Sequence, residues 1–114
     1  MITEEKCMKR GDIVWLTFKP QAGHEQAWHR PALVVSPEAY NRKVGLALFC
    51  PITSHIKGYP FEVQIPQENE VSGVVLADRV KSLDWKARQT SFCCALPNTT
   101  VHEVLNKLAT LIDD

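Results

Sequence analysis

The chain has 114 residues, which suffices for one domain with a buried core but not for two independent domains. Its 13 Lys and Arg residues balance its 13 Asp and Glu residues, which excludes a broad basic surface for nucleic acid or membranes but leaves room for a local basic groove. The sequence contains no signal peptide and no long apolar segment, and we therefore expect a cytoplasmic protein without a membrane role.

The four cysteines lack the paired spacing of a metal site. Cys7, Cys50 and the vicinal pair Cys93 and Cys94 include no CxxC motif, so the pattern indicates neither a zinc site nor a disulfide framework. In a regular strand, the two vicinal thiols would point to opposite faces. Cys50 and Cys93 lie in apolar runs, where a free cysteine usually behaves as a small buried hydrophobe. The pattern therefore favours a reducing compartment.

The first half of the chain predicts three strands and a short helical turn. We expect a loose N-terminal arm over residues 1–10, followed by a single domain over residues 11–114. "DIVWLTF" has two alternating apolar faces, as a strand covered on both sides would. "PALVVS" predicts the second strand, and "VGLALFCPIT" predicts a third that stops or bends near Pro51. Between them, Ser36 and Pro37 suit the N-cap and first turn of a helical turn in "PEAYN".

The loop between the first two strands, "GHEQAWHRP" (residues 23–31), is close to the zinc-binding HExxH motif but does not match it. In that motif the two histidines are four residues apart and share one helix face. His24 and His29 are five apart, which places them roughly 140° from each other on a helix and on opposite faces of a strand. Gly23 and Pro31 also disfavour a long helix here. We therefore expect a metal-free loop that gathers two imidazoles, a carboxylate and a guanidinium.

The second half of the chain predicts three more strands. "SHIKGYP" is a loop because of its Gly and Pro residues, and "FEVQIP" alternates, with Phe61, Val63 and Ile65 facing inward. "SGVVLADRVKSLDW" predicts one long strand that bends or bulges where Asp78 and Arg79 interrupt its apolar pattern. "TSFCCAL" predicts the last, short strand.

The C-terminal segment changes to a helical period. In "NTTVHEVLNKLATLIDD", Thr100 and Glu103 have the spacing of a capping box, and apolar residues recur every three or four positions. About six short strands and one helix in so small a chain favour a mainly β fold, a compact barrel closed by the C-terminal α-helix, over a layered α/β fold.

The segments "GDIVWLTFKPQAGHEQAWHRPALVVSPEAYN", "PITSHIKGYPFEV" and "GVVLADRVKSLDWKAR" resemble, in order and spacing, the MazF/PemK family of toxin endoribonucleases from bacterial toxin–antitoxin systems. The resemblance implies a small SH3-like β-barrel, a homodimer, and sequence-specific, metal-independent and cofactor-free cleavage of single-stranded RNA. Cleavage of mRNA would inhibit translation and growth. A cognate antitoxin is also implied, whose disordered acidic and hydrophobic tail covers the RNA groove.

In the implied reaction, the ribose 2′-hydroxyl attacks the phosphorus, and the resemblance assigns residues to it. Arg30 matches the family's catalytic arginine, and its planar guanidinium can hold two phosphate oxygens. Thr53 matches the second essential position and could donate its hydroxyl to the scissile phosphate. Glu25 is a candidate base or substrate-positioning group. The alternatives are a structural salt bridge between Arg30 and Glu25, a turn-forming Thr53, and a Glu25 that caps backbone amides.

Two histidines and an aspartate each have a catalytic and a structural interpretation. His24 occupies a position where one branch of the family has a histidine proposed to assist catalysis, and His29 precedes the arginine as in another branch. Either histidine could instead be structural. Asp78 matches an aspartate that the histidine-bearing branch pairs with an arginine two residues earlier, where this chain has Leu76. The acid role therefore moves toward Arg30 or a histidine, and Asp78 becomes a candidate for RNA binding, for an interface or for loop anchoring.

Further cationic and aromatic side chains are candidates for contacts with RNA phosphates and unpaired bases. The candidates are His29, Lys57, Arg79, Lys81, Lys86 and Arg88 for the RNA backbone, and Trp28, Phe18 and Tyr59 for stacking. The alternatives are an ordinary solvated face for the cations, core packing for Phe18, and a dimer or antitoxin contact for Trp28.

A second function is compatible with the same fold. CcdB proteins, which inhibit DNA gyrase without enzymatic activity, share this barrel and dimer, so a gyrase inhibitor is the alternative. Those proteins resemble one another in a Trp-Gly-Ile ending, whereas this sequence reads "ATLIDD" there. The sequence therefore favours the endoribonuclease, without defining the RNA sequence cleaved or the antitoxin.

Overall fold

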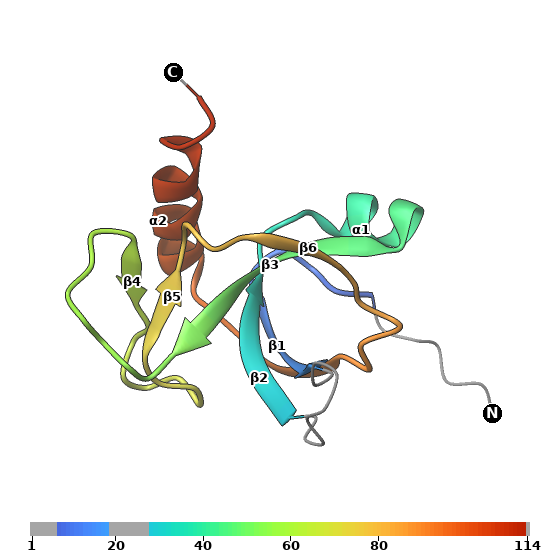
Figure 1. The fold of residues 1–114 in the computed structure, drawn as a ribbon, viewed down its shortest axis with the longest axis horizontal. Helices are drawn as coiled ribbons and strands as arrows, with labels where there is room; N and C mark the ends of the chain where they lie inside the picture. The colour runs from blue at the N-terminus through green and yellow to red at the C-terminus, as the bar shows by residue number, and fades with distance from the viewer. Residues whose placement is uncertain (1–6, 19–27, 114) are drawn as a thin grey trace, which may run out of the picture.

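The computed structural model describes residues 7–18 and 28–113, and within these ranges it is mainly β with a C-terminal helix, which confirms the predicted fold class. The described strands pair in antiparallel fashion (Figure 1). The elements are β1 (Asp12–Phe18), β2 (Trp28–Val34), α1 (Glu38–Val44), β3 (Leu46–Thr53), β4 (Glu62–Gln64), β5 (Val74–Leu76), β6 (Lys81–Asp84), β7 (Ser91–Ala95) and α2 (Asn98–Ala109).

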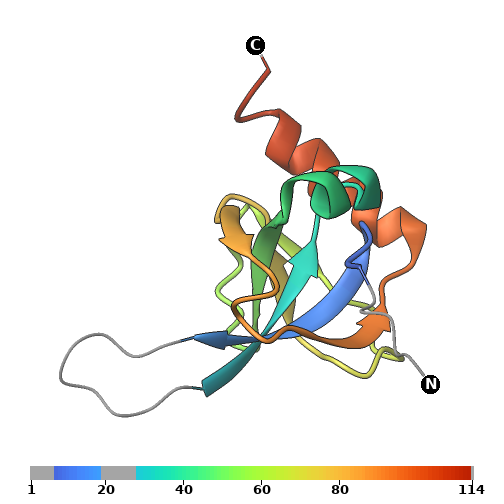
Figure 2. The same cartoon turned by 90° about the vertical axis from the view of Figure 1, so that its right-hand side faces the viewer.

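Strand β3 is the centre of the sheet. Along one edge it pairs with β2, and residues 46–49 pair with β6 while Ile52 and Thr53 pair with β5. The sheet order is β4-β5-β3-β2-β1-β7, with β6 on β3. In the described residues β4 and β7 remain at the two ends of this order, so the barrel is open rather than fully hydrogen-bonded. β1 and β2 run side by side, and their far ends project beyond the rest of the sheet (Figure 2).

The alternation of β1 separates two cores, as its sequence predicted. Ile13 belongs to the larger core, which also takes in Val101 and Val104 of α2. Val14 and Leu16 belong to a smaller core on the other face, closed by Trp85. Both faces of β1 are therefore covered by protein, which accounts for its unbroken apolar run.

Two strand predictions need correction. β2 begins at Trp28, so Trp28, His29 and Arg30 are strand residues and not part of a loop. The segment predicted as one long strand forms two, β5 and β6, which pair with different parts of β3. A turn at Ala77 and Asp78 separates the two strands. The turn is needed because β5 pairs with the C-terminal end of β3, whereas β6 pairs with its N-terminal half.

Both predicted helix caps are wrong. α2 begins at Asn98 with Pro97 at the N-cap, so Thr100 lies inside the helix, where it is buried, and cannot form a capping box with Glu103. α1 begins at Glu38 with Pro37 at the N-cap. Ser36 instead donates its hydroxyl to Asn41 Oδ1, at 2.5 Å, and accepts a hydrogen bond from the Leu48 amide.

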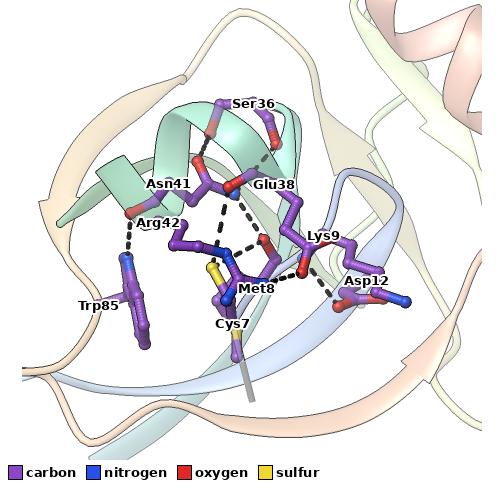
Figure 3. Close-up of polar contacts among 9 residues, drawn as sticks. All are labelled: Cys7, Met8, Lys9, Asp12, Ser36, Glu38, Asn41, Arg42 and Trp85. Carbon is purple, nitrogen blue, oxygen red and sulfur yellow. Dashed lines mark hydrogen bonds and ion pairs between the residues drawn. The ribbon is translucent and has the colours of Figure 1, made fainter. Parts of the chain in front are cut away.

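A buried polar cluster around Asn41 joins α1 to the segments on either side of it (Figure 3). The fully buried Asn41 side chain donates to the Met8 and Ser36 carbonyl oxygens, at 2.7 and 3.2 Å, and the Trp85 indole donates to the Asn41 carbonyl oxygen, at 3.2 Å. Met8 and its neighbour Cys7 are buried, so at these positions the predicted loose arm packs against the domain.

A β-bulge in β7 overturns the expected geometry of the vicinal cysteines. Ile13 pairs with Cys94 and Val14 with Phe92, which leaves Cys93 as an extra residue without its own partner in β1. Because a bulge interrupts the alternation of side chains, Cys93 and Cys94 do not point apart. Their sulfur atoms lie within 4.8 Å of each other.

Candidate functional site

Arg30 and Thr53 lie together because of the register between β2 and β3. Ala32 pairs with Pro51 across these strands. Arg30 lies two residues before Ala32 and Thr53 two residues after Pro51, so the two-residue period of antiparallel strands puts all four side chains on one face. Arg30 is exposed and Thr53 is half-buried. A guanidinium and a hydroxyl, both hydrogen-bond donors, therefore share one open surface.

Three neighbouring hollows share Arg30 and Thr53 in their walls, and we call them together the groove. The first, of 210 Å³, extends over Leu16 and Phe49 to Lys81. The second, of 430 Å³, is lined by His55, Lys57, Tyr59, Glu62, Leu76 and Arg79 as well. The third, of 400 Å³, lies toward Trp15, Ser54 and Glu70. Arg30, Lys57, Arg79 and Lys81 make the groove locally cationic although the chain is neutral overall.

The Thr53 hydroxyl is held at the end of β3. Its oxygen accepts a hydrogen bond from the His55 amide at 3.0 Å, which orients the hydroxyl and leaves its hydrogen available for a ligand in the groove. Gly73 lies directly against this strand end, with φ at +122°, and a Cβ there would overlap the Thr53 carbonyl oxygen. A glycine is therefore required at position 73 for β5 to reach Thr53.

Glu62 holds the loop that forms one wall of the groove. Its two carboxylate oxygens accept the amide hydrogens of Lys57 and Gly58, at 3.0 and 3.1 Å. From the other side, the Lys107 ammonium of α2 donates to the Pro60 carbonyl oxygen at 2.5 Å. These contacts orient Lys57 and Tyr59 without using their side chains, so those side chains stay exposed in the groove.

Tyr59 and Asp78 form a hydrogen-bonded pair across the groove wall. The Tyr59 hydroxyl donates to Asp78 Oδ2 at 2.5 Å, and this bond, which favours the neutral phenol, raises the pKa of Tyr59. Asp78 Oδ1 is buried and has no hydrogen-bond partner within residues 7–18 and 28–113. Asp78 itself does not line the three hollows. In this geometry it anchors the loop through Tyr59.

The structure brings together some of the predicted site residues and leaves others apart. Arg30, Thr53, Lys57, Arg79 and Lys81 line the groove. His29 does not, because it is adjacent to Arg30 in β2 and points to the other face, where its Nε2 lies 3.3 Å from the Thr17 hydroxyl.

Lys86 and Arg88 lie outside the hollows, in the turn after β6. The Lys86 ammonium lies 5.4 Å from the centroid of a Trp85 ring, and the Arg88 carbonyl oxygen accepts the Thr17 amide hydrogen, so the turn packs against the end of β1. His24 and Glu25 lie outside the described residues, as do the side chains of Phe18 and Trp28.

His55 and Glu62 are polar residues that line the groove and that the sequence analysis did not predict. His55 follows Thr53 by two positions, and Glu62 is the outward residue of the alternating "FEVQIP" segment. The alternation signals that Glu62 faces away from the core, but only the fold shows that it faces the loop of Lys57 and Tyr59.

The chain matches a family of known proteins over most of its length. A family model described as PemK-like, MazF-like toxin of type II toxin-antitoxin system matches residues 9–112. The chain is 54% identical to the endoribonuclease toxin MazF of Escherichia coli (strain K12) over 68% of this chain and 69% of that protein. It is 34% identical to the endoribonuclease PemK of Escherichia coli over 98% of this chain and 87% of that protein.

Solved structures show the same similarity. A chain in the crystal structure of MazE-MazF (Form-II) from Deinococcus radiodurans superposes with a TM-score of 0.91 at 51% identity, covering 95% of this chain and 97% of that chain. MazF (Form-I) from the same organism gives a TM-score of 0.85 at 50% identity, covering 96% of this chain and 100% of that one.

Proposed function

Since the chain belongs to the PemK-like, MazF-like toxin family of type II toxin–antitoxin systems, we propose that it is an endoribonuclease toxin that cleaves single-stranded RNA in the groove around Arg30 and Thr53. The single observation that carries this proposal is that the Arg30 guanidinium and the Thr53 hydroxyl lie together in the walls of all three hollows. The relatives are named endoribonucleases, so the gyrase-inhibitor alternative is not favoured.

The cleavage is a transfer of phosphorus from one oxygen to another. The 2′-oxygen attacks the phosphorus, the bond to the 5′-oxygen breaks, and the products are a 2′,3′-cyclic phosphate and a free 5′-hydroxyl. One group takes the proton of the 2′-hydroxyl and another gives a proton to the leaving oxygen. Arg30 supplies fixed positive charge where the equatorial oxygens become more negative, and Thr53 donates a hydrogen bond to the same phosphate. Glu25 stays a candidate base or substrate-positioning group, and Arg30 or a histidine stays a candidate acid.

Side chains along the groove suit the RNA phosphates and bases that neighbour the scissile phosphate. Lys57, Arg79 and Lys81 offer cations on both sides of the Arg30 and Thr53 pair. Tyr59, held by Asp78, offers an aromatic ring on which an unpaired base can stack. We propose that these contacts bind the RNA strand and place its scissile phosphate at Arg30.

We further propose that the reaction needs no metal ion. Among the described residues, the potential metal-binding group of three consists of Glu70, Cys93 and Cys94, and it includes no cationic or hydroxyl group of the proposed reaction. The nucleophile is the 2′-hydroxyl of the substrate, so no metal-bound water is required. A base, an acid and the two hydrogen-bond donors Arg30 and Thr53 suffice for the reaction.

The test is incubation of the purified protein with a mixed single-stranded RNA in excess EDTA, followed by mapping of the cut sites and of their end chemistry. We expect cuts at one short recurring sequence, with cyclic phosphate and 5′-hydroxyl ends. The Arg30→Ala protein, purified in parallel, controls for contaminating nucleases. Loss of cleavage in EDTA that Mg²⁺ or Zn²⁺ restores, or cuts with 5′-phosphate ends, would refute the mechanism.

The partner of the toxin is an antitoxin, as in the solved MazE-MazF complexes, and we propose that its acidic and hydrophobic tail covers the cationic groove. We also propose that the protein acts in the cytoplasm, where mRNA is present. No helix in the described ranges is long and apolar enough to cross a membrane.

A further inference from the structure

Two thiols and a carboxylate from different parts of the chain converge beside the bulge of β7. Cys93 and Cys94 come from β7 and Glu70 from the segment between β4 and β5. The two sulfur atoms and a carboxylate oxygen all lie within 4.8 Å of one another. Sequence spacing gave no sign of this group, since Glu70 is remote from the cysteines and a regular strand would separate the two thiols.

The donor set suits a thiophilic divalent cation. Zinc accepts thiolate and carboxylate ligands at about 2.3 and 2.0–2.2 Å, so ligand atoms of a tetrahedral site lie about 3.5–3.8 Å apart. Small side-chain rotations would therefore close the observed group around one ion. The two thiols favour zinc over magnesium or calcium, which prefer oxygen ligands.

The surroundings hold the group in place and leave it accessible. Asn69 donates its amide hydrogens to Cys94 Sγ at 3.9 Å and to the Ala95 carbonyl oxygen at 3.3 Å, which ties the segment of Glu70 to β7. Such outer hydrogen bonds orient metal ligands in known sites. Cys93 and Cys94 are half-buried and Glu70 is exposed, so an ion can reach the site from solvent, and water can supply the fourth ligand.

Metal binding fits this pair of thiols better than a disulfide does. The Cα atoms of adjacent residues are about 3.8 Å apart, below the roughly 4.4–6.8 Å that disulfides usually span.

We propose that Glu70, Cys93 and Cys94 form a zinc-binding site that clamps the segment around Asn69 and Glu70 onto β7. The ion has a structural role: Glu70 also lines the third hollow of the groove, but none of the three ligands is a group of the proposed cleavage reaction. The site therefore stands independently of the endoribonuclease activity, and its ion can be removed by EDTA without removing a catalytic group.

The test uses the full chain, reduced and stripped with EDTA. Titration with Co²⁺, a spectroscopic substitute for zinc, should give a near-ultraviolet sulfur-to-cobalt charge-transfer band that saturates at one ion per chain and disappears when Zn²⁺ is added. Zn²⁺ should also raise the Tm, because the folded chain, which brings Glu70 to the two thiols, binds the ion more tightly than the unfolded chain does.

Substitutions identify the ligands. Loss of an outer hydrogen bond costs about 10–100-fold in metal affinity, so Cys93→Ser and Cys94→Ser should each weaken zinc binding, measured against a chromophoric chelator, by at least about 100-fold. Glu70→Gln should weaken it by about tenfold or more. Cys7→Ala is the matched control, because Cys7 belongs to the other core and should leave the cobalt band unchanged.

Circular dichroism establishes that each variant is folded. Absence of a charge-transfer band in the wild-type protein, a band that persists in the Cys93→Ser/Cys94→Ser double variant, or saturation at one ion per two chains would each overturn the proposal.

Discussion

Asp78 supports the wall of the groove through Tyr59, although Asp78 does not line the three hollows. One of its oxygens accepts the Tyr59 hydroxyl hydrogen, while the other is buried without a hydrogen-bond partner in the described part of the chain. A buried, unsatisfied carboxylate oxygen is costly, and the short bond to Tyr59 offsets part of that cost. The sequence left Asp78 between RNA binding, an interface and loop anchoring, and the geometry supports loop anchoring.

Cys50 provides a pH-dependent prediction for a single side chain. Burial, with a smaller contribution from the Asp78 charge, raises the pKa of Cys50 from 9.0 to about 12. The folded chain therefore keeps this proton at pH values where the unfolded chain releases it. The resulting stability is fully present below about pH 9 and is lost between about pH 9 and pH 12.

We expect the free energy of unfolding, measured by urea denaturation, to fall above pH 9, with a Cys50 contribution of at most about 1.4 kcal/mol per pH unit. Cys50→Ala removes the thiol, so its curve should be flatter in this window even though it starts from a lower stability. Parallel curves for the two proteins would show that Cys50 does not titrate in this way.

At the scale of elements, the Asn41 cluster holds α1 between the first described residues and the Trp85 turn. Asn41→Ala removes the acceptor of the buried Ser36 hydroxyl hydrogen and the amide donor to the Met8 carbonyl oxygen. We expect a loss of about 2–4 kcal/mol in the free energy of unfolding. Asn106→Ala is the matched control, because Asn106 is an exposed asparagine inside α2 and should change stability by less than about 0.5 kcal/mol. Equal effects of the two substitutions would contradict the structural role of the cluster.

The contact between Gly73 and the end of β3 gives a prediction that links an element to the reaction. Gly73→Ala and Gly45→Ala both place a side chain at a positive φ, which costs about 1–2 kcal/mol. A Cβ at Gly45 meets nothing within 4 Å, whereas one at Gly73 overlaps the Thr53 carbonyl oxygen. Gly73→Ala should therefore be the less stable protein.

Because Thr53 has to shift, the folded fraction of Gly73→Ala should also cleave RNA more slowly, while Gly45→Ala should cleave at the wild-type rate. The measurements are urea denaturation and cleavage per folded molecule. A Gly73→Ala protein that matches Gly45→Ala in both would show that Thr53 does not depend on this contact.

Across the fold, the sequence predicted those strands and helices that show a hydrophobic period within their own segment. Alternation in "DIVWLTF" and the helical period after Asn98 led to β1 and α2, because burial of one face imposes those periods directly. The split between β5 and β6 was missed, since it depends on two different partners along β3, and so was the bulge that turns Cys93 toward Cys94. Within the proposed site, the family resemblance predicted Arg30 and Thr53, and the strand register explains why these two residues lie together.

The chain also exposes apolar side chains, which favour association with a second copy of the chain. Val44, Leu111 and Ile112 are 49%, 52% and 77% exposed. A homodimer would bury apolar surface of this kind. We propose that the protein is a homodimer, so light scattering at micromolar concentration should give twice the mass of one chain, and a monomer under these conditions would contradict this proposal.

We propose that Arg30 stabilises charge that develops only in the transition state. A group of this kind affects the rate of the chemical step more than the binding of substrate. Losing it typically lowers the rate by a factor of about 10²–10³. Arg30→Lys keeps the charge but loses the planar pair of donors, so it should recover only part of the rate. Arg79→Ala, which removes a cation elsewhere in the groove, should weaken binding with little change in the saturated rate.

The most direct measurement is therefore single-turnover cleavage of a short RNA by saturating Arg30→Ala enzyme in EDTA, compared with its affinity for an uncleavable 2′-deoxy analogue. We expect a folded protein that binds the analogue within about tenfold of wild type and cleaves the RNA at least about 100-fold more slowly. A folded Arg30→Ala protein that cleaves at the wild-type saturated rate would show that Arg30 is not a catalytic residue.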